Sequence, residues 1–455
     1  MEPIDILILG AGSAGFGAAY RALLSGNHRV VLVDSNPILG GTSTLGGVNN
    51  WEPGVGGKGV HFEIARRLME RGEGAVCATK PQDEFVPGHH YALSTPCDDP
   101  YESTLQRFGR TAQEFRRFQF APQAMHEVML ELLQEADSDG RLELLLSSKF
   151  LSAETQGERI TSCTVQTPAG ERIFAPRMVI DCTADIVVAR AVGCDHTVGE
   201  ESRDTYGEII APEVSSRTLN GMTLCFRIDY TGTTELPEVP EAYRDVDISD
   251  WEKNFYPASC FSAYPKGGVS VNMLPTGEGD WLLRYSDAEL RHILTGRVYK
   301  YWRCLVQNSG LQGWEITEIF PMLALRESYR LRGKYVLTYS DLCHGFAPSL
   351  GQAHTIAWAD HPADTHGRGY SAGLKPTGLY GIPYECIVPK EYRNLLVACR
   401  GASFSHMAAS SARLSRTMIA LGEAAGNAAV YCLANKIDPT EVPEEAIATF
   451  VPQTP

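Results

Sequence analysis

The first 35 residues alternate apolar runs with a glycine-rich turn and a helical pattern. An apolar run at 4–9 leads into Gly10, Gly12 and Gly15, and a second apolar run follows at 30–33. Small apolar side chains recur at helical spacing between the third glycine and the second run. This order predicts a strand, a helix and a second strand of a parallel sheet.

Strand patterns recur in the middle of the chain and near its end. Short runs between 142 and 175, separated by turns, predict a strand followed by a β-meander. Continuous apolar runs at 178–182 and 394–399 are typical of buried parallel strands. They indicate that the chain returns twice to the sheet begun at its N-terminus.

The residues between these returns predict a second domain. Residues 206–337 combine strand-like runs with a long helical pattern, so we expect an inserted α+β substrate or cap domain. The first domain would then comprise residues 1–205 and 338–455. Residues 77–122 show no sustained period and predict a lid or binding loop. An apolar stripe at 411–436 predicts one long final helix.

The glycines of the first unit suit a bound dinucleotide. Gly10 permits a tight turn, Gly12 lets backbone approach a pyrophosphate, and Gly15 lets the helix pack close to the sheet. The helix N-terminus offers free N–H groups to phosphates, and Asp34 is placed to accept a hydrogen bond from a ribose hydroxyl. The unit predicts a Rossmann-like domain of the α/β class and leaves NAD and FAD open.

A second glycine-rich segment follows at 40–47. Its two glycine pairs remove side chains, as expected where backbone lies against a flat ligand. A flexible linker is the alternative, although Leu45 and Val48 are unusual in a solvated Gly/Ser linker.

Composition narrows the classes of partner and location. A net charge of −15 argues against a nucleic-acid partner, because phosphate contacts need clustered Lys and Arg. No signal-peptide pattern and no run of about twenty apolar residues is present, so we expect no membrane span and a cytoplasmic location. Twelve scattered cysteines without CxxC suit free thiols. The pair His89-His90 lacks a third ligand nearby, so no metal site is expected.

The discontinuous first domain favours FAD, because a plain NAD dehydrogenase would keep its nucleotide domain contiguous. The sequence resembles the FAD-dependent oxidoreductase family, which shares the fold of glutathione-reductase-type flavoproteins. The matching segments reach from one end of the chain to the other: Gly10 to Gly15, Gly40-Gly41-Thr42, residues 179–185, residues 326–337, Ile382-Pro383-Tyr384 and residues 394–426.

The resemblance implies where FAD would bind. The first turn would hold the pyrophosphate and ribose, the second glycine-rich segment would continue toward the flavin, and residues 400–426 would pass the isoalloxazine. Relatives commonly carry Thr-Gly-Asp where this chain has Thr183-Ala184-Asp185. The implied cofactor-binding residues are Gly10, Gly12, Ser13, Gly15, Asp34, Ser35, Gly41, Thr42, Asp185, Arg400 and Leu414.

The missing motifs restrict the reaction. The chain has no CxxxxC pair after the second strand and no second GxGxxG, which argues against a dithiol relay and a separate NAD(P)H domain. Direct hydride transfer between FAD N5 and a small polar metabolite, hydroxylated or carboxylated, is the simpler hypothesis. The alternatives are reduction of an activated double bond by the flavin, or an FAD-binding RNA-modifying or redox-sensing protein.

Three residues are candidates for the chemistry. His406 lies in the segment expected near the flavin and could take a proton from the substrate, or be a structural histidine. Tyr384 could be an acid/base group or a core tyrosine. Arg413 could stabilise a reduced flavin or anchor a carboxylate. The adjacent Arg326 and Glu327 are interpreted as members of structural ion pairs, with contact to the substrate as the alternative.

Overall fold

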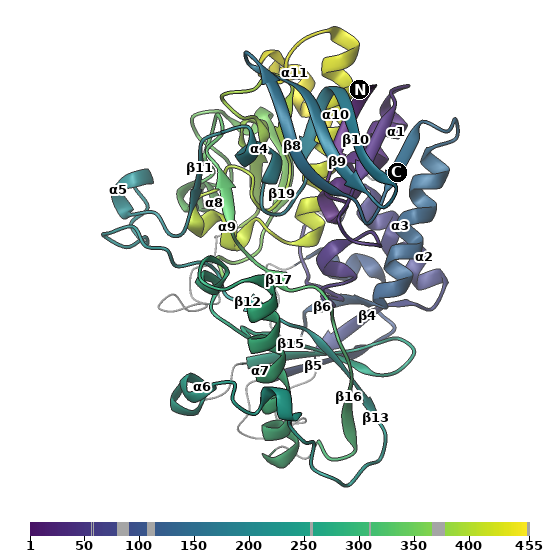
Figure 1. Cartoon of the computed structure of the whole chain (residues 1–455), viewed down its shortest axis with the longest axis vertical. Coiled ribbons are helices and arrows are strands. Elements are labelled where there is room, and N and C mark those ends of the chain that lie inside the picture. The colour runs from purple at the N-terminus through teal and green to yellow at the C-terminus, as the bar shows by residue number, and fades with distance from the viewer. Residues whose placement is uncertain are drawn as a thin grey trace.

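Two sheets organise the molecule. The computed structural model describes residues 1–55, 57, 59–79, 91–106, 114–254, 258–308, 311–365 and 378–452. One sheet lies at the end of the molecule that carries both termini, and the other lies toward the opposite end (Figure 1).

The first sheet confirms the predicted Rossmann-like domain. Its parallel part runs β7-β2-β1-β10-β21, so two late segments of the chain pair beside the N-terminal unit. The antiparallel strands β8 and β9 extend it as the predicted meander. The strands are β1 (Glu2–Leu9), β2 (Val30–Val33), β7 (Leu142–Leu145), β8 (Lys149–Gln156), β9 (Arg159–Thr167), β10 (Gly170–Asp181) and β21 (Leu395–Val397).

Strand β10 joins the meander to the parallel sheet without interruption. Its first part pairs with β9 as far as Phe174, and its last part pairs with β21 from Val179. Pro176 lies between these two parts, where β10 pairs with neither β9 nor β21. A proline, which cannot donate a ladder hydrogen bond, is therefore tolerated in a central strand.

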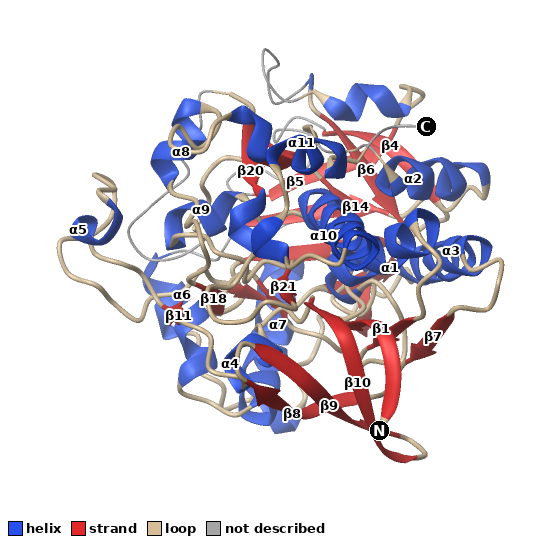
Figure 2. Ribbon diagram, turned by 90° about the horizontal axis from the view of Figure 1, so that it is seen from above, coloured by secondary structure: helices blue, strands red, loops and turns tan. Residues whose placement is uncertain are grey.

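Helices α1 (Ser13–Ser25) and α10 (Ser415–Asn435) pack side by side against this sheet (Figure 2). Small residues allow the close approach, since a Cβ on Gly422 would lie 1.9 Å from the carbonyl oxygen of Ala14. Helix α10 is long and apolar enough to cross a membrane, but 83% of its most apolar window is buried. It is a core helix of this domain.

The prediction of one continuous final helix at 411–436 is wrong at its start. The structure has a short helix α9 (His406–Ser411), a break, and then α10. Ser405 caps α9 by accepting a hydrogen bond from the N–H of Ala408. Leu414 is extended, with ψ of 147°, and this backbone conformation ends one helix and begins the next.

The second sheet combines strands from two parts of the chain. Four of its strands come from residues 226–319 and four from residues 50–120, so the predicted range 206–337 supplies half of it. The predicted domain boundaries stay an interpretation. In order across the sheet the strands are β16 (Trp314–Ile319), β13 (Phe226–Tyr230), β15 (Val269–Leu274), β14 (Ala258–Ala263), β5 (Tyr91–Pro96), β4 (Gly74–Thr79), β6 (Arg116–Phe120) and β3 (Asn50–Trp51).

The expectation of an irregular lid at 77–122 is corrected by this sheet. Strands β5 and β6 and the end of β4 lie within that range. Small and polar residues in these strands hide the alternation that would have predicted them. The pair His89-His90 lies outside the described residues.

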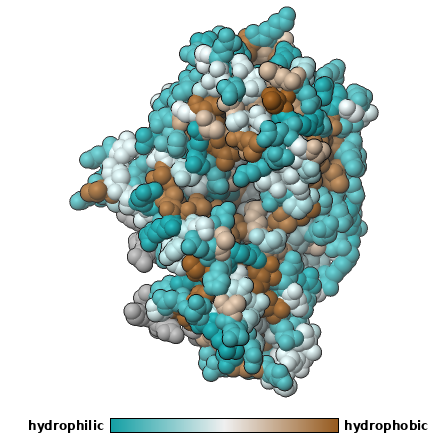
Figure 3. Space-filling model, in the orientation of Figure 1, coloured by the Kyte–Doolittle hydropathy of each residue, from teal (hydrophilic) through white to brown (hydrophobic). Residues whose placement is uncertain are grey.

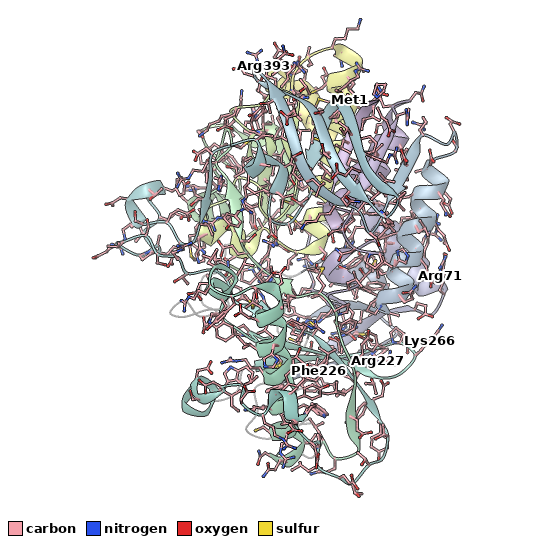
Figure 4. All side chains as sticks on the ribbon, viewed as in Figure 1. Met1, Arg71, Phe226, Arg227, Lys266 and Arg393 are labelled. Carbon is pink, nitrogen blue, oxygen red and sulfur yellow. The ribbon has the colours of Figure 1, made fainter. Side chains whose placement is uncertain are left out.

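One face of the second sheet is apolar and is covered by helix α7 (Asp287–Asn308). Neighbouring residues on β13 differ accordingly: Phe226 packs edge-on to Trp302 of α7, whereas Arg227 pairs with Asp229 (both Phe226 and Arg227 are labelled in Figure 4). The outer surface is mostly hydrophilic, with apolar patches scattered over the middle of the face in Figure 3.

Shorter elements complete the described fold. The strands pair as β11 with β18, β12 with β17 and β19 with β20. The remaining helices and strands are α2 (Val60–Glu70), α3 (Pro122–Ala136), α4 (Val187–Ala191), β11 (His196–Val198), α5 (Arg203–Tyr206), β12 (Met222–Thr223), α6 (Ser249–Asn254), β17 (Ala324–Leu325), β18 (Tyr329–Leu331), α8 (Tyr339–His344), β19 (Thr355–Ala359), β20 (Tyr380–Pro383) and α11 (Glu444–Ile447).

Candidate cofactor and substrate site

The turn between β1 and α1 leaves space beside Gly12. Gly10 has a φ of +96°, and a Cβ there would lie 2.5 Å from the carbonyl oxygen of Cys182. A Cβ on Gly15 would lie 1.6 Å from the Gly10 carbonyl oxygen, whereas a Cβ on Gly12 would meet nothing within 4 Å. The first and third glycines serve packing, and the second opens onto a cavity.

The groups around this opening suit an anionic, ribose-bearing ligand. Ser13 begins α1, and its buried hydroxyl has no hydrogen-bond partner. Asp34 follows β2; its carboxylate accepts hydrogen bonds from the backbone N–H of Ala11, at 2.5 Å, and of Asn36, at 2.8 Å. The helix N-terminus favours phosphate, and the fixed carboxylate can accept a ribose hydroxyl.

A cavity of about 820 Å³ extends from this turn. Its size falls in the range of about 300–1,000 Å³ that ligand sites occupy. Most of the predicted cofactor residues line it, together with one of the three predicted catalytic residues. The predicted residues on its wall are Gly10, Gly12, Ser13, Asp34, Ser35, Gly41, Thr42, Asp185, Arg400 and Arg413.

The second glycine-rich segment is ordered against the first. The N–H of Gly40 donates to the carbonyl oxygen of Ala11 at 2.9 Å, and a Cβ on Gly41 would lie 3.3 Å from the Gly12 Cα. Farther along, Ser43 and Ser415 share a hydrogen bond of 3.1 Å between their hydroxyls. The segment thus connects the turn after β1 with the start of α10, and the linker alternative does not hold.

Asp185 and Arg400 form an ion pair on the cavity wall. Arg400 Nη2 donates to Asp185 Oδ1 at 2.8 Å, and the hydroxyl of Ser328 donates to the same oxygen at 2.5 Å. Burial alone would raise the pKa of Asp185, but the charge of Arg400 and these hydrogen bonds outweigh it and lower that pKa. The carboxylate stays ionised at the cavity.

The far end of the cavity is formed by the start of α10. Arg413, Ser415 and Met418 line it there, and Leu414 is the residue that precedes the helix. Arg413 donates to the backbone carbonyl of Asp364 at 3.4 Å, and its Nε has no partner. Burial, only partly offset by the charge of Asp364, lowers the pKa of Arg413. A helix N-terminus and a guanidinium together favour negative charge at this end.

The polar face of the second sheet turns toward the glycine-rich segment. Ser270 on β15 donates to the carbonyl oxygen of Gly47 at 3.3 Å. Several buried polar atoms on this face, or in the chain leading to it, have no hydrogen-bond partner among the described residues. These atoms are Asn49 Nδ2, Asn50 Oδ1, Gln119 Nε2 and Oε1, and Asn272 Oδ1.

Arg326 also lies in this region. The sequence predicted it to belong to a structural ion pair. It donates to the carbonyl oxygen of Gly221 at 2.7 Å and to the hydroxyl of Thr223 at 2.8 Å. Burial and the nearby charge of Arg413 lower the pKa of Arg326 to about 9. Its neighbour Glu327 points to a different cluster.

That cluster contains His406, which is buried and is absent from the residues that line the cavity. Its Nδ1 lies 2.9 Å from Glu327 Oε2, and its backbone N–H donates to Glu201 Oε2 at 2.9 Å. Arg330 pairs with both carboxylates. The catalytic role of His406 stays a prediction, and its described contacts are those of a buried ion network.

Tyr384 is also outside the cavity wall. Its hydroxyl donates to the backbone carbonyl of Pro439 at 3.0 Å, and its ring packs beside Phe450. Burial raises its pKa well above the usual range. No group of three or more metal-ligating side chains is found in the described part of the chain.

An open approach to Gly12, an unpaired Ser13 hydroxyl, a carboxylate after β2 and a second helix N-terminus fit FAD laid along the cavity. Gly10, Gly12 and Ser13 would hold the pyrophosphate, and Asp34 the ribose. The start of α10 would lie near the flavin.

A comparison with protein families identifies the cofactor, and comparisons with solved structures show distant similarity. The chain is similar to the solved structures of a geranylgeranyl bacteriochlorophyll reductase-like protein from Thermoplasma acidophilum (12% identity, TM-score 0.48, 99% of this chain and 82% of that chain) and of the myxobacterial chondrochloren halogenase CndH (12% identity, TM-score 0.48, 99% and 78%). No curated protein matches its sequence. A family model described as FAD dependent oxidoreductase matches residues 5–451. The chain therefore belongs to the FAD-dependent oxidoreductase family, and FAD is its cofactor.

Proposed function

We propose that the protein transfers a hydride between a small polar metabolite, hydroxylated or carboxylated, and N5 of the flavin. The observation that carries this proposal is the set of unpartnered polar atoms where the second sheet faces the glycine-rich segment. Buried polar atoms are costly unless a ligand or water pairs with them. Polar substrate groups would supply that pairing.

Bound FAD supplies the hydride acceptor or donor, and the chain supplies orientation and charge. Arg413 and the first N–H groups of α10 would hold negative charge at the far end of the cavity. The polar face of the second sheet would bind and orient the substrate. Asn272 and Gln119 are suited to this because their side-chain amide atoms are available for hydrogen bonds.

Oxidation of an alcohol or amine also requires a proton acceptor. His406 was predicted for this role. A proton that it accepts would be stabilised by the carboxylate of Glu327, whose Oε2 lies 2.9 Å from His406 Nδ1. His361 is a second candidate, because its Nε2 lies 3.6 Å from Glu52 Oε2 and the charge of Glu52 also acts on Arg413. We therefore propose His361 beside His406 as the group that receives the proton.

Anaerobic bleaching of the flavin absorbance tests the proposed reaction. The FAD-loaded protein would be mixed with a panel of sugars, hydroxy acids, amino acids and amines, with oxygen excluded. We expect at least one member of the panel to bleach the flavin in a saturable manner. Loss of all bleaching, with FAD bound stoichiometrically, would contradict hydride transfer from this class of metabolite.

Matched histidine variants separate the two proton acceptors. We expect replacement of the acting base, as His361→Gln or His406→Gln, to slow bleaching by about 100-fold or more and to remove the pH dependence that the base causes. For His406 that dependence would lie near pH 4, because burial lowers its pKa to about 4. The other variant should keep the pH profile of the parent. If both variants retain the parental rate and profile, neither histidine receives the proton.

A further inference from the structure

Two deeply placed guanidinium groups lack a carboxylate partner. Arg326 donates to a backbone carbonyl and a hydroxyl, and Arg413 donates to a backbone carbonyl. Within the described residues, neither forms an ion pair. Arg330 and Arg416 differ, since Arg330 pairs with Glu201 and Glu327, and Arg416 pairs with Asp360.

The two groups lie against the same segment of chain. Arg413 donates to the carbonyl oxygen of Asp364, and Gly221, whose carbonyl oxygen accepts from Arg326, donates its N–H to the carbonyl oxygen of Thr365 at 3.3 Å. The positive charge of Arg413 adds to burial in lowering the pKa of Arg326. The charge of Asp364 acts on both groups and that of Glu52 acts on Arg413, but burial outweighs these charges and lowers both pKa values. Both side chains keep part of their surface accessible. A bound anion could reach them and would add to the stabilisation that these carboxylates give.

The surroundings of the two guanidinium groups indicate which chemical groups the ligand carries. Burial raises the pKa of the Cys260 thiol on β14, and the charges of Arg117, Glu52 and Arg326 also act on this thiol. Cys260 pairs in register with Asn272, whose Oδ1 is unpartnered. The guanidinium pair therefore lies beside the polar face of the second sheet, and the ligand would need an anionic group together with neutral polar groups.

We propose that Arg326 and Arg413 form a carboxylate-binding subsite that fixes an anionic substrate between the polar face of the second sheet and the flavin. A planar carboxylate offers two oxygens, which suits recognition by guanidinium groups approaching from two elements. Arg413 reaches the subsite from the break between α9 and α10, and Arg326 from the residue after β17. This inference rests on the proposed function and names the substrate class within it.

Equilibrium binding to the FAD-loaded protein tests the subsite without requiring turnover. Glycolate, succinate and benzoate, each paired with its neutral amide, would be titrated by calorimetry and by perturbation of the flavin spectrum. We expect at least one acid to bind more tightly than its amide. Arg326→Gln and Arg413→Gln should each weaken that binding by about 10- to 100-fold, since each removes a charge-assisted donor.

Lysine and control variants keep the test specific. Arg413→Lys should recover part of the affinity, because it restores the charge without the planar fork. Arg303→Gln is the matched control, since Arg303 also donates to a backbone carbonyl, that of Pro237 at 2.6 Å. It should bind like the parent. The melting temperature of Arg413→Gln should stay close to that of the parent, because the charges of Asp364 and Glu52 offset only part of the cost of burying Arg413.

The outcomes distinguish this subsite from the proposed function. Binding of acids that depends on both arginines, with no metabolite bleaching the flavin, would support the subsite and contradict the reaction. Bleaching by neutral metabolites at parental rates in both glutamine variants would support the reaction and overturn the subsite. Equal affinity for acid and amide, or absence of binding by all three acids, would also overturn it.

Discussion

At the scale of single residues, the three glycines of the first motif do different work. Gly10 and Gly15 are in contact with backbone, whereas the position that a Cβ would take on Gly12 is empty. Gly12 also has a φ of −69°, which any residue can adopt. Its glycine is therefore required by the ligand and not by the fold.

We expect Gly12→Ala to fold like the parent and to bind FAD about 10- to 100-fold more weakly, because the added methyl would overlap the pyrophosphate by an amount that costs a few kcal/mol. FAD titration and thermal unfolding of the apoprotein would measure the two effects separately. Gly140→Ala, which meets no neighbouring atom but has a φ of +68°, is a control away from the cavity. Undiminished FAD affinity in Gly12→Ala would contradict the assignment.

Sequence reasoning placed on the cavity wall those residues that belong to a local motif, while their roles stay predictions. The turn after β1 and Asp34 are such residues, because strand, glycines, helix and acid occupy fixed positions in one unit. Arg326 was predicted to belong to a structural ion pair, with substrate contact only as the alternative. Its adjacent opposite charge suggested an ion pair, but Glu327 pairs with Arg330, and only the fold brings Arg326 toward Arg413.

At the scale of elements, α10 is held to its neighbours by one buried carboxylate. Glu423 accepts a hydrogen bond from Arg21 of α1 at 2.6 Å and one from the N–H of Val60, at the start of α2, at 3.3 Å. Burial, partly opposed by Arg21, raises the pKa of Glu423 from 4.5 to about 6. The folded state therefore holds this proton more tightly than the unfolded chain does.

The sign of the resulting pH dependence follows from linkage. Between pH 4.5 and about 6 the folded state binds more protons than the unfolded state, so Glu423 should reduce stability by about 2 kcal/mol as the pH rises through this window. We expect Glu423→Gln to flatten that part of the stability profile, measured by urea unfolding. Exposed Glu445→Gln is the control. An unchanged slope in Glu423→Gln would contradict the raised pKa.

At the scale of the whole molecule, the second sheet explains both the site and the limit of prediction. Strands β14 and β5 pair in parallel although about 160 residues separate them, for example Ser259 with Tyr91. Nothing local in the sequence indicates which distant segment a strand pairs with, and β5 lies in the range that was predicted to be irregular. The sequence therefore predicted the α/β class and the discontinuous first sheet, but not that residues 50–120 help to form the substrate side.

This arrangement gives the molecule two functional ends around one cavity. Under the proposed function, the first sheet and its turn would hold the adenosine half of FAD, and the start of α10 and the second sheet's polar face would lie around the flavin half. Arg330 pairs with Glu201 and Glu327, and Glu201 also accepts a hydrogen bond from the N–H of His406 at the start of α9. Substrate selection would then be separated from nucleotide binding.

The most direct test of hydride transfer is the rate of anaerobic flavin reduction with a deuterated substrate. A metabolite that bleaches the flavin would be compared with the same metabolite carrying deuterium on the carbon that loses hydrogen, in single-turnover rapid mixing. We expect reduction to be slower with deuterium, because the carbon–hydrogen bond breaks in that step. Saturating flavin reduction at equal rates with both forms would contradict rate-limiting hydride transfer to N5 as the chemical step.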